Sequence, residues 1–240
     1  MEKFVVKASR FAFYFFILAQ GAIWGVLLFA DIGWHKYLAY ANVALCFAYS
    51  FAFLRKENHT ILQCGAFACT CVADFFLILL EGAYKTTAMF FFLGAQLLYA
   101  VRVFLLCEGQ KEKSLQIWLR IAASAASLIC LLAVLKEDAQ LLFAVSLVYY
   151  VNLVISLIFA FIHWKQGISV RLLAVGLLCF ACCDLSIGFD FLIDIFSLGE
   201  SSFLYFITHL PISFVTLFYP PSQTLLCLST HADEFFAQKD

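Results

Sequence analysis

Long runs of apolar residues dominate the chain, and short polar clusters separate them. Each run has about 20 residues, the length that an α-helix needs to cross the hydrocarbon core of a bilayer. The clusters are DIGWHK, RKENH, EGAYK, EGQKEK, KED, HWKQG and SLGESS. The pattern predicts eight transmembrane helices, over residues 9–30, 36–54, 60–80, 87–107, 115–135, 139–163, 170–195 and 202–229.

The composition supports a membrane protein. Hydrophobic residues make up 65% of the chain and charged residues 13%, and the mean hydropathy is +0.96. A soluble core cannot bury that much apolar surface, so the chain is expected to be an all-α, polytopic integral membrane protein. The net charge of −1 argues against nucleic-acid binding. No linker between the runs is long enough to separate domains, so residues 1–240 are predicted to form a single transmembrane helical domain.

Positive charges alternate from one connection to the next and predict the orientation. Ten lie at the N-terminus and in the second, fourth and sixth connections: Lys3, Lys7, Arg10, Arg55, Lys56, Lys111, Lys113, Arg120, Lys165 and Arg171. The other connections hold only Lys36, Lys85 and Lys136. Cytoplasmic loops are enriched in Lys and Arg, so both termini of this multi-pass protein are predicted to be cytoplasmic.

Motifs for several kinds of chemistry are absent from the sequence. The ten cysteines lie mostly in apolar runs and are expected to pack as small hydrophobic residues. Neither Cys69–Cys71 nor Cys182–Cys183 has the spacing of a zinc or redox pair. There is no GxSxG or HExxH motif and no phosphate-binding glycine loop. Among the histidines only His209 is well inside a predicted helix, so no metal and no cofactor is expected.

Two acidic residues lie at membrane depth. Asp74 and Asp184 are each about 14 residues from the cytoplasmic start of their helices, roughly 21 Å along the axis. Ionisable groups at this depth are costly and indicate function, although a buried structural hydrogen bond would also explain them. If the third and seventh helices are neighbours, the two carboxyl groups can share one cavity. Asp190 and Asp194, nearer the outer end, are expected to have structural or rim roles.

Other polar residues follow single faces of three helices. These are Gln96, Tyr99 and Arg102, then Tyr149, Asn152 and Ser156, and finally His209, Ser213, Thr216, Pro220 and Gln223. Such faces must meet protein or water, which predicts a polar cavity enclosed by the helices. The simpler alternatives are hydrogen bonds to neighbouring backbone and, for Arg102, extension of its side chain to the interface.

A pair of carboxyl groups in apolar surroundings suits acid–base chemistry. Such a pair can share one proton near neutral pH, so that one member donates a proton and the other accepts one from water. Hydrolysis of an acid-labile bond would use this arrangement. Proton-coupled transport would use it equally well.

Four segments of the chain resemble the YhhN family of membrane proteins, the lysoplasmalogenase-like group. They read CTCVADFFLIL, FFFLGAQLLY, CFACCDLSIGFDFL and FYPPSQTLLCLS, and the last contains Tyr219, Gln223 and Ser229. Their order and spacing along about eight helices match the family over nearly the whole chain. The sequence departs from the family pattern at four positions, where Ala73, Gln96, Cys183 and Asp190 replace glycine, histidine, serine and asparagine.

The resemblance implies hydrolysis of the vinyl ether bond of lysoplasmalogens, a lysophospholipid substrate drawn from the membrane lipids. One aspartic acid, either Asp74 or Asp184, would protonate the enol ether carbon, and the other would stabilise the oxocarbenium ion and orient water. Phe-rich helices would hold the alkyl chain. The residues expected to contact the glycerol and phosphate are Gln96, Tyr99, Arg102, Tyr149, Asn152, His209, Tyr219 and Gln223.

Two other functions use the same features. The protein could be a transporter that couples these acids to proton movement, although the sequence shows no inverted repeat. It could also be a lipid-binding relative without catalysis, because Gln96 replaces the family histidine. Turnover of a defined lipid separates the enzyme from both alternatives.

Overall fold

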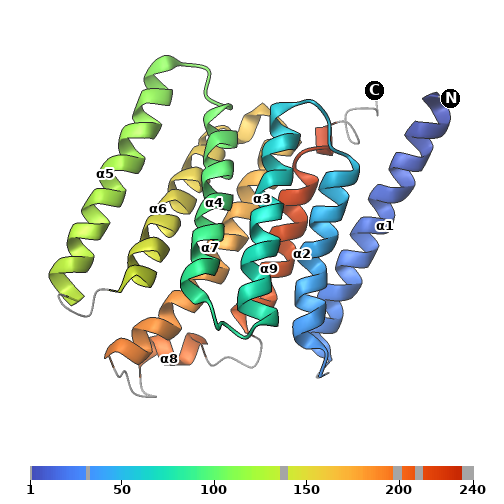
Figure 1. Cartoon of the computed structure of the whole chain (residues 1–240). Helices are drawn as coiled ribbons and strands as arrows, with labels where there is room; N and C mark the ends of the chain where they lie inside the picture. The colour runs from blue at the N-terminus through green and yellow to red at the C-terminus, as the bar shows by residue number, and fades with distance from the viewer. Residues whose placement is uncertain (1, 31–32, 136–139, 197–201, 209–212, 234–240) are drawn as a thin grey trace.

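A computed structural model of the chain describes residues 2–30, 33–135, 140–196, 202–208 and 213–233. All regular secondary structure in these ranges is helical, which confirms the predicted all-α class (Figure 1). The elements are α1 (Glu2–Phe29), α2 (His35–Ala52), α3 (Asn58–Asp74), the π-helix η1 (Phe75–Leu79), α4 (Lys85–Phe104), α5 (Gln110–Leu135), α6 (Leu141–Ile162), the 3-10 helix η3 (Trp164–Gln166), α7 (Ile168–Phe196), α8 (Phe203–Thr208) and α9 (Phe214–Leu228).

Six helices of the described chain are long and apolar enough to cross a membrane. Their spans are Phe11–Phe29, Asn58–Leu79, Lys85–Phe104, Gln110–Val134, Leu141–Ile162 and Ile168–Ile193. The two other predicted spans contain the shorter helices α2, of 18 residues, and α9, of 15. The chain is therefore a multi-pass membrane protein.

The first seven predicted spans each correspond to one of the helices α1 to α7, but the eighth does not form one helix. Residues 202–229 contain two separate helices, α8 and α9, and Ser213 before α9 has extended backbone angles (φ −61°, ψ 130°). The extended angles at Ser213 give the physical reason, because a continuous α-helix through residues 202–229 would need helical angles at that residue. Residues 209–212 lie outside the described ranges.

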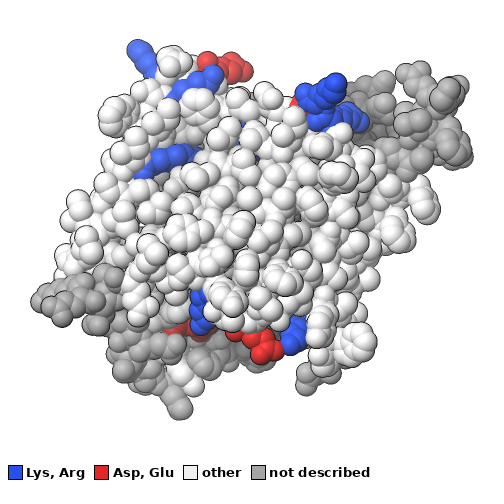
Figure 2. Space-filling model, in the orientation of Figure 1, with Lys and Arg blue, Asp and Glu red and all other residues white. Residues whose placement is uncertain are grey.

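Neighbouring long helices alternate in direction, so their ends gather at two faces of the bundle (Figure 1). The ends of α2, α4 and α6 and the starts of α3, α5 and α7 lie at the upper face, which also carries the start of α1 and the end of α9. Charged side chains on the visible surface lie towards the upper and lower edges (Figure 2). The positively charged connections thus share one face, and its cytoplasmic location remains the prediction from loop charge.

The most extensive helix packing among the described residues is between α7 and α9. At Gly176 of α7, an added Cβ would lie 2.9 Å from Cγ and 3.0 Å from the backbone nitrogen of Leu226. Glycine therefore permits an approach that no larger residue allows. Helix α3 packs against α2 and α4, while α6 packs against α4, α5 and α7. The lower ends of these helices surround the site.

Candidate active site

Asp74 is the last residue of α3 and is buried in the bundle, with 3% of its surface exposed. The Tyr219 hydroxyl of α9 donates a hydrogen bond to Asp74 Oδ2. The π-helical turn η1 follows Asp74 immediately. Such turns widen the helix locally and occur frequently at functional sites. The sequence pattern gave no sign of this turn.

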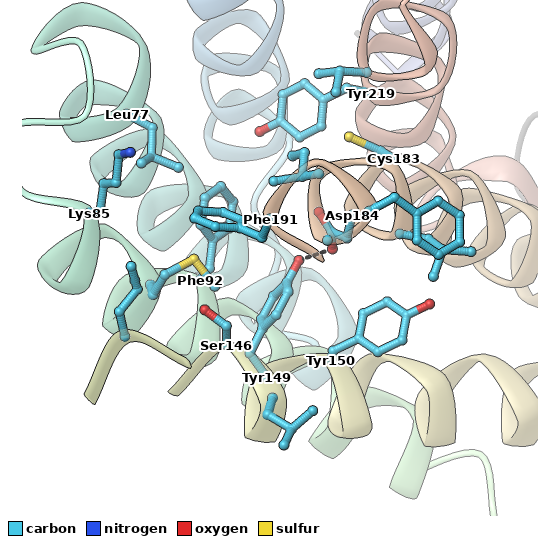
Figure 3. Close-up of a pocket in the computed structure, with 18 of the residues that line it drawn as sticks. Leu77, Lys85, Phe92, Ser146, Tyr149, Tyr150, Cys183, Asp184, Phe191 and Tyr219 are labelled. Atoms are coloured by element: carbon cyan, nitrogen blue, oxygen red, sulfur yellow. Dashed lines mark hydrogen bonds between the residues drawn. The ribbon is translucent and has the colours of Figure 1, made fainter. Parts of the chain in front are cut away.

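Asp184 of α7 has an equivalent partner. The Tyr149 hydroxyl of α6 donates a hydrogen bond to Asp184 Oδ2 (Figure 3). Asp184 is only partly buried, because it faces a cavity rather than packed side chains. Each carboxyl group is therefore held through one oxygen by a tyrosine from another helix, and its second oxygen is free of protein hydrogen bonds among the described residues.

One cavity of about 1090 Å³ contains both acids and both tyrosines. Its volume is slightly above the range of about 300–1,000 Å³ that is typical of small-molecule sites. Leu27, Lys85, Val134 and Val215 are among its lining residues, which places it among the lower helix ends of Figure 1. The lining is mainly apolar, and its polar members are His35, Asp74, Lys85, Ser127, Ser146, Tyr149, Tyr150, Asp184, Thr216 and Tyr219.

The two acids share this cavity although their helices are not a main packing pair. Helix α3 packs mainly against α4 and α2, and α7 mainly against α9 and α6. Asp74 and Asp184 nevertheless both belong to the lining of the one cavity. The tyrosines explain the arrangement. Tyr219 binds Asp74 from α9, which packs against α7, and Tyr149 binds Asp184 from α6, which packs against both α4 and α7.

Arg102 and Tyr99, predicted to bind substrate, belong to a separate buried cluster. The Arg102 guanidinium donates to Ser229 Oγ and to the Ser229 carbonyl oxygen, each at 2.8 Å, and also to Gln63 Oε1. Gln63 Nε2 donates to the Tyr99 hydroxyl at 3.2 Å. None of these residues lines the cavity. Their hydrogen bonds join α3, α4 and the end of α9.

Three more of the predicted substrate ligands also lie outside the cavity lining. Asn152 Oδ1 accepts a hydrogen bond from Arg120 at 3.0 Å. Gln96 and Gln223 are fully buried and do not line the cavity. His209 lies outside the described residues. Of the eight predicted ligands, the structure therefore brings Tyr149 and Tyr219 to the acids.

Sequence reasoning missed several cavity residues. Lys85 was counted only as a loop charge, yet it lies on the α4 side of the cavity, opposite Asp184 (Figure 3). Its Nζ is 5.9 Å from the centre of the Phe191 ring. Ser146 and Tyr150 flank Tyr149 on α6. Ser146 lies three residues before Tyr149, a helical spacing that could have revealed it.

Comparison with known proteins gives one result. A sequence model described as the YhhN family matches residues 35–218. The matched range includes Asp74, Tyr149 and Asp184 and ends one residue before Tyr219. No curated protein and no solved structure matches the chain.

Proposed function

This chain belongs to the YhhN family, and we propose that it hydrolyses the vinyl ether bond of lysoplasmalogens in the cavity that holds Asp74 and Asp184. The family is known for lysoplasmalogenase activity. One observation carries the proposal for this chain: two tyrosine-bound carboxyl groups face a single large, mainly apolar cavity inside a membrane protein. A single-chain lipid with a polar end matches such a site in size and chemistry.

The reaction begins with transfer of a proton to carbon. The protonated carboxyl group donates its proton to the enol ether carbon farther from oxygen, and the C=C electron pair forms the new C–H bond. The remaining cation is an oxocarbenium ion. The ionised carboxylate stabilises this charge across a short distance in low-dielectric surroundings.

Water completes the reaction. The ionised carboxylate accepts a proton from water as the water oxygen bonds to the oxocarbenium carbon, which gives a hemiacetal. Cleavage of the hemiacetal C–O bond leaves a fatty aldehyde and a free hydroxyl on the glycerophospho-base. One water molecule is consumed, and the two carboxyl groups together regain their single proton.

The tyrosines position the carboxyl groups. Each phenol hydroxyl donates to Oδ2 of its aspartate, which fixes the rotation of the carboxyl group and leaves the other oxygen for proton transfer. The aromatic rings of Tyr149 and Tyr219 both contact Phe180. This buried ring packs against both tyrosines and limits their movement.

Lys85 is the residue we assign to the substrate phosphate. It contributes a positive charge to the cavity lining at the first residue of α4, at the lower end of the bundle. An ammonium group binds phosphate through charge-assisted hydrogen bonds. Arg102 was expected to take this role, but its guanidinium is buried and is already bonded by Gln63 and Ser229.

The proposal is tested by matched aspartate variants. Purified wild-type protein in detergent should release fatty aldehyde from lysoplasmenyl-ethanolamine, and Asp74→Asn and Asp184→Asn should each lower the rate by about 100-fold or more. Asp190→Asn, on the exposed surface of α7, is the control and should retain activity. Near-full activity in both Asp74→Asn and Asp184→Asn would exclude the assignment.

A further inference from the structure

A second cluster of reactive side chains lies at the opposite end of the bundle from the cavity. Cys107 follows α4, Glu112 is in the first turn of α5, and His163 follows α6. Cys107 Sγ is 3.6 Å from His163 Nε2, and Glu112 Oε1 is 2.7 Å from the same nitrogen. The three donor atoms all lie within 4.8 Å of one another.

The cluster is sheltered from solvent. Cys107 is 2% exposed, and the side chains of His163 and Glu112 are 11% and 29% exposed. Gln116, one turn after Glu112, is 1% exposed, and its Nε2 donates a hydrogen bond to Cys107 Sγ at 3.5 Å. Four polar groups from three segments of the chain thus surround one small volume.

The geometry differs from that of a Cys–His–Glu catalytic triad. In a triad one ring nitrogen of histidine faces the thiol and the other faces the carboxylate. Here both Cys107 and Glu112 contact Nε2 of His163. Donor atoms that converge on one point are typical of ligands around a metal ion.

The distances agree with tetrahedral coordination. Around a zinc ion with Zn–N of about 2.0 Å and Zn–S of about 2.3 Å, the nitrogen and sulfur ligands are about 3.5 Å apart. The observed distance between Sγ and Nε2 is 3.6 Å. The pair formed by Glu112 and His163 would have to open by roughly 0.5 Å, which a partly exposed carboxylate can do by rotation.

We propose that Cys107, Glu112 and His163 form a zinc-binding site that joins the ends of α4 and α6 to the start of α5. A thiolate with an imidazole favours zinc over magnesium or calcium, which prefer oxygen ligands. Cys107 thiolate and Glu112 carboxylate together balance the two positive charges of the ion. The fourth position is left to water.

The proposed zinc site would hold α5, the long helix that is least buried in the bundle. Helix α5 packs mainly against α6, and its side chains are largely exposed. A metal ion shared with the ends of α4 and α6 fixes the start of α5 relative to the two helices that carry Lys85 and Tyr149. The role is structural and distinct from the chemistry of the cavity.

Cobalt binding to the full-length protein tests the proposal. Chelator-treated protein in detergent is titrated with Co²⁺, which gives a thiolate charge-transfer absorption when cysteine binds it. Wild type should show this band at one Co²⁺ per chain, and Zn²⁺ should abolish it. Cys107→Ser should lose the band, His163→Gln should bind at least 10-fold more weakly, and Cys64→Ser should behave as wild type.

A measurement of thermal stability tests the proposal even if one of the variants folds poorly. Zn²⁺ should raise the thermal midpoint of wild type, because it binds the folded state, and should leave that of Cys107→Ser unchanged. Cys107→His retains a zinc ligand, so it should keep the Zn²⁺-dependent rise without the thiolate band. Absence of a stoichiometric band in folded wild type, or an unchanged band in Cys107→Ser, would overturn the proposal.

Discussion

At the scale of residues, the site consists of two carboxyl groups and the tyrosines that hold them. Removal of a hydroxyl leaves the aspartate in place but frees its rotation. Tyr149→Phe and Tyr219→Phe should each lower kcat by about 10- to 100-fold, the equivalent of a hydrogen bond to a charged group of about 1.5–3 kcal/mol. KM should change little, because the phenol donates to the acid rather than to the lipid.

Initial rates of aldehyde release over a range of lysoplasmenyl-ethanolamine concentrations check this expectation. Tyr37→Phe, an exposed tyrosine outside the cavity lining, is the control and should be unaffected. A rise in KM with unchanged kcat in the cavity variants would show that the tyrosines bind substrate and do not position the acids.

The sequence predicted the two aspartates of the site, but it did not predict most of the residues that surround them. Asp74 and Asp184 stand out because a charged group at membrane depth needs a reason. Polar periodicity on α4 correctly identified a buried face, but it could not give the position of each residue along the bundle. Tyr99 and Arg102 are therefore buried as expected, yet they bond Gln63 and Ser229 well away from the cavity. The depth of each residue in the bundle and its hydrogen-bond partner depend on how α9 packs against the other helices. A local sequence pattern does not contain that information.

At the scale of elements, α9 contains two prolines and still packs in the core. Pro220 has no amide hydrogen, so the carbonyl oxygen of Thr216 lacks its helical partner. Trp24 Nε1 of α1 donates to that oxygen at 3.2 Å. In a bilayer an unpaired carbonyl is costly, so this bond compensates for the proline.

Loss of this bond should destabilise the bundle. Trp24→Phe keeps an aromatic ring but removes the donor, and it should reduce the free energy of unfolding by about 1–3 kcal/mol. Thermal unfolding in detergent measures the effect. Trp34→Phe, at a 73% exposed position, is the control, and equal midpoints for the two variants would contradict this role.

The contact between α7 and α9 leads to a second prediction, which concerns the stability of helix packing. Gly176→Ala would place its methyl group 3.0 Å from the backbone nitrogen of Leu226, which has no freedom to move away. The substitution should cost about 1–3 kcal/mol of stability. Gly21→Ala in α1, where the added Cβ has nothing within 4 Å, should be neutral or slightly stabilising. Thermal midpoints in detergent compare the two, and a neutral Gly176→Ala would contradict the close packing.

Hydrophobic runs predicted helices α1 to α7 because length and apolar content define a membrane helix directly. They could not show that the last run, 202–229, contains two helices, since its residues remain apolar across the break. The sequence pattern also did not predict the π-helical turn after Asp74, because this turn depends on packing against α2 and α4.

At the scale of the whole molecule, the chain is a helical membrane protein with its two proposed sites at opposite faces. The cavity lies among the lower helix ends, and the Cys107–Glu112–His163 cluster lies where α4, α5 and α6 meet at the upper face (Figure 1). The sequence predicted a polar cavity, whereas the observed lining is mainly apolar with a few polar groups. An apolar lining suits an alkyl chain, and it strengthens electrostatic interactions between the acids and a cationic intermediate.

Hydrolysis of lysoplasmenyl-ethanolamine in D₂O is the decisive test of the proposed reaction, because it reports both the product and the proton transfer to carbon. Wild-type protein should release a fatty aldehyde that carries one deuterium on the carbon next to the carbonyl group, and Asp74→Asn and Asp184→Asn should release none above background. Folded wild-type protein that releases no aldehyde, or aldehyde without that deuterium, would contradict it. Substrate-dependent proton flux in liposomes in place of turnover would identify the protein as a transporter.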